Sequence, residues 1–145
     1  MRPPSPRRAL AAALAACAAA AHAAPVTPRV GAFTGVVAAG YSSPQITFTV
    51  RAGRVTLLVA RMFHRCNGGP LTQTVIAPSG GYRIRPNGTF SGRTTESIAG
   101  IASETVWFSG RFTGRNSATG SIRSQTVGGG ETCDTLQRRF RATHR

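Results

Sequence analysis

The chain has 145 residues, and its 18 basic residues, all of them arginine, outnumber four acidic ones to give a formal net charge of +14. All 17 glycines follow residue 30, and they make up about 14% of the residues after position 23, twice the usual share. Because each glycine inside a helix costs about 1 kcal/mol relative to alanine, long helices are disfavoured. The length fits one modest domain. Together these features exclude large α/β enzymes, helical bundles and multidomain proteins.

The first 23 residues have the organisation of a secretory signal. Arg2, Arg7 and Arg8 form a positive front, and an alanine-rich apolar run covers 9–21. That run is shorter than the about 20 residues that cross a bilayer. Residues 21–23 read Ala-His-Ala, which fits the A-x-A cleavage pattern. We therefore expect a signal peptide over 1–23, an extended lead-in over 24–30 and a single β-domain over 31–145.

A second interpretation of the same segment involves Cys17. Residues 14–17 read Leu-Ala-Ala-Cys and resemble a bacterial lipobox, in which the cysteine becomes the lipidated first residue. The protein would then be held at a membrane face instead of being released. No other segment is apolar enough to form a transmembrane helix.

After either cleavage, Cys66 and Cys133 are the cysteines that remain to pair with each other. Because an exported protein meets an oxidising compartment, we expect them to form one disulfide. Closing the loop between positions 66 and 133 would stabilise the domain by about 4 kcal/mol in the chain-entropy model. The alternative is a metal site made of His64, Cys66, Cys133 and His144, although their spacing matches none of the usual zinc patterns.

From residue 31 onward, strand-like runs alternate with Gly, Pro and Asn breakers every eight to twelve residues, a pattern typical of all-β proteins. It predicts about eight antiparallel strands in a flattened barrel or sandwich. The expected strands cover 32–37, 45–50, 55–63, 71–77, 82–85, 89–94, 104–113, 118–127 and 135–142, and 97–103 stays open as a loop or short strand. The run 55–63 is apolar on both faces, so it is either central or carries a bulge.

A small motif recurs in these strands, with an aromatic or small apolar residue two positions before a glycine. Residues 33–35, 90–92, 108–110, 112–114 and 118–120 follow it. Both residues of each pair lie on one strand face, so we expect inward side chains to alternate with glycines where strands bend or pack closely.

No catalytic or cofactor motif stands out in the sequence. The glycines at 128–130 lack the following Lys-Ser/Thr of a phosphate-binding loop. His64 and Asp134 are the residues on which a hydrolase would have to be built, because the expected disulfide brings their neighbourhoods together. No serine is marked as their nucleophile, so we expect no enzymatic activity and keep this hydrolase as an alternative.

Four of the arginines form two pairs on strand faces, Arg83 with Arg85 and Arg139 with Arg141. An arginine-lined face can hold phosphate, sulfate or carboxylate groups through bidentate hydrogen bonds. The alternative is a solvated face that blocks edge-to-edge aggregation. Most aromatic rings fall at core positions, so the sequence predicts no specific nucleic-acid site.

The region 31–142 resembles a group of uncharacterised secreted β-domains common in GC-rich actinobacteria. The resemblance is carried by residues 31–35, 63–66, 87–92, 108–114, 118–123 and 132–135. It implies an all-β fold with one disulfide and brings no assigned activity. We therefore expect an exported, non-enzymatic β-domain that acts as a binding or structural module at the cell surface or outside the cell. Within that class, the arginine faces favour a binder of anionic envelope polymers.

Overall fold

The computed structural model describes residues 24–145, so the expected signal peptide and Cys17 lie outside the described residues. Ten strands follow one another along these described residues. They are β1 (Gly31–Val37), β2 (Ile46–Arg51), β3 (Arg54–Cys66), β4 (Leu71–Ile76), β5 (Tyr82–Arg83), β6 (Thr89–Ile98), β7 (Ala102–Gly114), β8 (Ser117–Gly128), β9 (Glu131–Asp134) and β10 (Arg138–His144). Within residues 24–145, no helix is long and apolar enough to cross a membrane.

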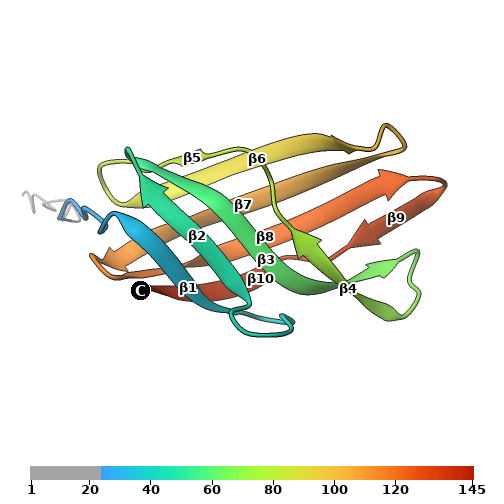
Figure 1. Ribbon diagram of the computed structural model, residues 1–145, viewed down its shortest axis with the longest axis horizontal. Helices are drawn as coiled ribbons and strands as arrows, with labels where there is room; N and C mark the ends of the chain where they lie inside the picture. The colour runs from blue at the N-terminus through green and yellow to red at the C-terminus, as the bar shows by residue number, and fades with distance from the viewer. Residues whose placement is uncertain (1–23) are drawn as a thin grey trace, which may run out of the picture.

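Six of these strands close into an antiparallel barrel. The hydrogen-bonded ring runs β10-β1-β2-β3-β9-β8, and β8 pairs back to β10. The ring is extended by β7 and β6 beyond β8, while β4 and β5 add to β3. Both the entry of the chain and its C-terminus lie at one end of the elongated barrel, opposite the β6–β7 and β8–β9 hairpins (Figure 1). The expected all-β fold is confirmed, in its barrel form.

The core is built from side chains that alternate with outward residues along each strand. Six phenylalanines are almost completely buried: Phe33, Phe48, Phe90, Phe108, Phe112 and Phe140. Their rings contact one another, as in the stacked pair Phe108–Phe140 with ring centroids 5.1 Å apart. Phe48 on β2 also contacts Phe108 on β7, with ring centroids 6.0 Å apart, so the rings join strands that are not hydrogen-bonded to each other.

In two copies of the aromatic-x-glycine motif, those that end at Gly110 and Gly120, the glycine has the packing role that the spacing predicts. Gly110 and Gly120 face each other on β7 and β8. Phe90 lies opposite Gly110 on one side, and Phe140 lies opposite Gly120 on the other. A Cβ at Gly120 would come within 2.7 Å of the Phe140 ring. The glycines therefore make room for rings that belong to neighbouring strands.

The run 55–63, which is apolar on both faces, lies in β3 and contains a bulge, one of the two explanations expected for this pattern. Thr47 pairs with Val59, but Thr49 pairs with Thr56, so β3 has one extra residue between these pairs. Leu57 has a positive φ of 49° and is 74% exposed. The bulge changes the phase of β3 and turns an apolar side chain outward.

The described part of the chain has ten strands where about eight were expected, and the observed boundaries differ from the expected ones most clearly in two segments. The open stretch 97–103 forms the tip of a hairpin, because β6 continues to Ile98 and β7 begins at Ala102. The start of the last strand, expected over 135–142, is wrong, since β10 begins at Arg138. The residues around Cys133 form a separate short strand, β9. Strand β9 pairs with both β3 and β8. Its sequence has no alternation of apolar residues, so it forms a strand because of these partners.

The disulfide between Cys66 and Cys133 is confirmed. The two cysteines are direct register partners on β3 and β9. Beside them, the Asn67 N–H donates to the Thr132 carbonyl and the Thr132 N–H donates to the Asn67 side chain. The covalent link and these hydrogen bonds fix the short strand that completes the ring.

Candidate anion-binding site

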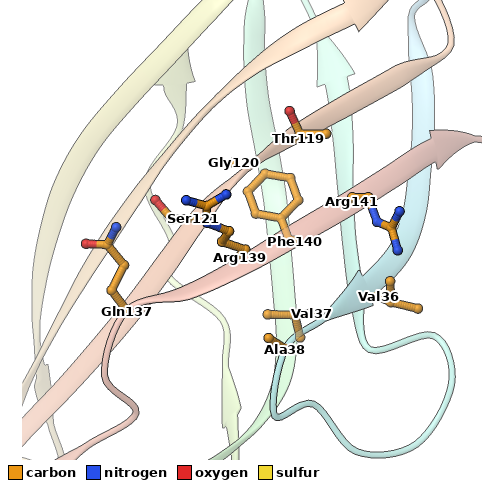
Figure 2. Close-up of a pocket in the computed structure, with 10 residues that line it drawn as sticks. All are labelled: Val36, Val37, Ala38, Thr119, Gly120, Ser121, Gln137, Arg139, Phe140 and Arg141. Atoms are coloured by element: carbon orange, nitrogen blue, oxygen red, sulfur yellow. The ribbon is translucent and has the colours of Figure 1, made fainter.

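A groove of about 740 Å³ lies on the outer side of β10, between the end of β1 and β8. We call it the β10 groove. It is lined by Val36, Val37, Ala38, Thr119, Gly120, Ser121, Gln137, Arg139, Phe140 and Arg141. Figure 2 shows the Arg139 side chain beside Ser121, and the Arg141 side chain on the side of Val36.

Strand alternation explains why both arginines reach this groove. Phe140 and Ala142 are only 2% exposed and point into the core, so Arg139 and Arg141 point outward. Arg139 lies opposite Ser121 on β8, whereas Arg141 lies between Thr119 on β8 and Val36 on β1. The two arginines that were expected to share a strand face are therefore brought together.

The guanidinium groups of Arg139 and Arg141 have no hydrogen-bond or ion-pair partner among residues 24–145. Each guanidinium carries five N–H donors in a fork that matches phosphate, sulfate or carboxylate. Within a concave surface, both forks are free to bind an anion from solution. This chemistry makes the groove a candidate site for anionic groups.

The acidic residues do little to offset this charge. Residues 24–145 contain 15 arginines and all four acidic residues, a formal net charge of +11. Asp134 accepts two hydrogen bonds from Arg123, at 3.1 and 2.5 Å. These hydrogen bonds are the main reason that the pKa of Asp134 is lowered. Arg123 is the one arginine with an ion-pair partner among the described residues.

Two further acids are hydrogen-bonded to serines instead of arginines. Glu96 accepts bonds from the hydroxyl and the backbone N–H of Ser79, which lower its pKa. Glu104 accepts a bond from Ser124. The described part of the chain thus keeps most of its positive charge uncompensated.

The second expected pair, Arg83 and Arg85, lies elsewhere. Arg83 on β5 is the register partner of Arg54. Arg85 follows β5 and donates to the hydroxyls of Thr89 and Ser91 at the start of β6. Neither residue lines the β10 groove.

The structure does not assemble His64 and Asp134 into a catalytic pair. Cys66 faces Cys133 and Arg65 faces Asp134 in the β3–β9 register. Because side chains alternate along a strand, His64 shares the sheet face of the disulfide and Asp134 points from the opposite face. The Asp134 carboxylate is also occupied by Arg123 and by the backbone N–H of Leu136.

Three of the four residues in the alternative metal site do come together. Possible ligand atoms of His64, Cys66 and Cys133 lie within 4.8 Å of one another. The two sulfur atoms are joined in the disulfide, however, so neither is the thiolate that binds a metal. His144 lies beside β1, where its ring contacts Phe33 and the Val30 carbonyl.

Sequence reasoning missed the hydroxyl residues that border the arginines. Thr119 and Ser121 line the β10 groove, and they flank Gly120 at the end of one aromatic-x-glycine motif. The sequence signal was present: if the first and third motif positions point inward, the position between them points outward. Only the strand order shows that these hydroxyls lie opposite β10.

Comparison with known proteins adds no functional assignment to this geometry. No protein-family model, curated protein or solved structure matches the chain.

Proposed function

We propose that the protein is an exported, non-enzymatic binding module that holds anionic groups of cell-envelope polymers in the β10 groove. The observation that carries this proposal is the pair of unpartnered guanidinium groups, Arg139 and Arg141, in one groove. The resemblance to secreted actinobacterial β-domains fits a module of this kind. Because the uncompensated charge extends over the whole domain, it also attracts polyanions before contact.

Export is supported by two independent features. Residues 1–23 have the positive front, short apolar run and cleavage pattern of a signal. The disulfide is typical of proteins that fold in an oxidising compartment. In this proposal the domain is released after residue 23, and lipidation at Cys17 is the alternative.

An intact-mass measurement on protein from an exporting bacterial host tests this step. We expect the mass of 24–145 less two hydrogens for the disulfide. A lipid-modified chain that starts at Cys17 would instead place the domain at a membrane face. If the protein recovered from this host still contains residues 1–23, the result would contradict export with cleavage of a signal.

The groove itself is tested with the double variant Arg139→Ser/Arg141→Ser and a sulfated dextran as probe. We expect binding to weaken about tenfold or more, since each bidentate contact to a charged group contributes about 1.5–3 kcal/mol before screening. The affinity of the unchanged protein should fall steeply as salt rises. The measurement is a titration calorimetry series at several salt concentrations.

The matched control is Arg51→Ser/Arg115→Ser, which removes the same charge from two exposed positions, the last residue of β2 and the turn between β7 and β8. If the control weakens binding as much as the groove variant, general charge and not the groove binds the polymer. Equal binding by all three proteins would contradict the proposal altogether.

A further inference from the structure

The groove arginines belong to a larger charged surface on the outer face of β10, β8, β7 and β6. We infer that this surface binds a linear, phosphate-rich polymer without bases, which lies across the four strands. The inference rests on the proposed function and deepens it, because it names the ligand class and adds residues outside the β10 groove.

Register places two rows of outward side chains across these strands. The first row is Arg141, Thr119, Arg111 and Thr89, and the second row is Arg139, Ser121, Ser109 and Ser91. We call the two rows together the arginine track. Its arginines are separated by short hydroxyl side chains, which leave the guanidinium groups accessible. The Thr119 hydroxyl can donate to a phosphate oxygen, while the Thr89 hydroxyl donates to Asn87 and those of Ser109 and Ser121 are hydrogen-bonded to each other.

Arg85 closes the track at β6. Its guanidinium donates to Thr89 of the first row, at 3.5 Å, and to Ser91 of the second row, at 2.9 Å. One arginine therefore spans both rows at the far end, as Arg139 and Arg141 do at β10. The sequence pair Arg83 and Arg85 is thus divided, and Arg85 alone joins the same surface as the β10 pair.

The track contains no acidic side chain. Glu96 and Glu104 are register partners on β6 and β7, and alternation places Glu104 on the inward side with Val106, which is 2% exposed. Asp134 is held by Arg123 beyond the second row. A polyanion on the track therefore meets only arginine and hydroxyl groups.

The length of the track favours a polymer over a single anion. From β10 to β6 there are three steps between neighbouring strands, each of about 4.8 Å, so the strands alone span about 14 Å. A single phosphate reaches one arginine or two neighbours. A flexible chain can contact Arg139 or Arg141, then Arg111, then Arg85, and each contact adds to the affinity.

Trp107 argues against recognition of nucleic-acid bases. It lies in the next row of the same face, between its register partners Arg93 and Arg123. The two guanidinium carbons lie 5.5 and 5.2 Å from its ring centroid. Single-stranded nucleic acids bind by stacking bases on open aromatic faces, and this ring already has cationic partners.

The test measures the binding of phosphate, tripolyphosphate and long inorganic polyphosphate by calorimetry at several salt concentrations. We expect affinity to rise by at least tenfold from tripolyphosphate to the long chain. Arg111→Gln, outside the β10 groove, should weaken the long chain about fivefold and lower the salt slope by about one ion. The control Arg51→Gln, outside the track, should leave the binding of both ligands unchanged.

The results separate the two proposals. If tripolyphosphate and the long chain bind equally well and Arg111→Gln has no effect, the track is wrong while the groove stands. If the unchanged protein binds every probe no more tightly than the Arg139→Ser/Arg141→Ser variant does, the proposed anion site in the β10 groove is also wrong. If single-stranded oligothymidine binds more tightly than polyphosphate with the same number of charges, the inference that the ligand lacks bases is wrong. Binding only to vesicles of anionic lipid would also contradict a linear phosphate polymer as the ligand.

Discussion

At the scale of single residues, the barrel depends on glycines that accept neighbouring rings. We expect Gly120→Ala to destabilise the protein by about 1–3 kcal/mol, because the added Cβ would overlap the Ser109 carbonyl and the Phe140 ring. Urea denaturation measures this loss. Gly114→Ala is the matched control, since the nearest neighbour of its Cβ would be the Ser117 hydroxyl at 3.6 Å, an ordinary van der Waals distance. Equal stability of the two variants would contradict the packing role of Gly120.

The ion pair between Asp134 and Arg123 gives a second prediction at this scale. The pKa of Asp134 is lowered in the folded state, first by the hydrogen bond from Arg123. Its stabilisation is therefore full above the unfolded pKa of about 3.9 and is lost as pH falls through the lower folded pKa. We expect Asp134→Asn to cost about 1 kcal/mol at pH 7, because Arg123 is partly exposed and screened.

This pH dependence is checked by urea denaturation at pH 7 and at several values between 5 and 2. The difference between the variant and the unchanged protein should shrink as the pH falls and vanish below the folded pKa. A difference that stays constant over this range would show that the carboxylate charge contributes nothing and that the substitution acts through packing alone.

At the scale of elements, β9 is the strand that depends most on the disulfide. It has four residues and bridges β3 to β8. We expect Cys66→Ser/Cys133→Ser to lower the free energy of unfolding by about 4 kcal/mol, from the 67-residue separation of the cysteines. Amide exchange should accelerate first in β9. If β9 amides stay as protected as those of β7, hydrogen bonds alone hold the ring closed.

The elements also show what the sequence could predict. Strand β2 was expected because its apolar residues alternate, and this local pattern is readable without a fold. Strand β9 was missed because Glu131–Asp134 has no apolar alternation and forms through its partners on β3 and β8. Arg139 and Arg141 were candidates because they lie two apart on one strand. Arg111 was not, because its place beside them depends on the order β10-β8-β7.

At the scale of the whole molecule, the charge that would bind polymers also opposes folding. A net charge of +11 with one ion pair among residues 24–145 produces self-repulsion in the compact state. We therefore expect salt to have opposite effects on stability and on binding. Raising NaCl from about 20 to 500 mM should screen the repulsion and raise Tm by a few degrees, roughly 1 kcal/mol for a domain of this size.

The same increase in salt should weaken polyphosphate binding by orders of magnitude, because the release of counterions into a more concentrated salt solution gains less entropy. At low salt, bound polyphosphate should raise Tm more than NaCl does, since a ligand of the folded state stabilises it by mass action. Thermal unfolding with and without polyphosphate at both salt concentrations measures all of these effects together. If polyphosphate raises Tm equally at 20 and 500 mM, the contact is not electrostatic, and the arginines of the track do not hold the ligand.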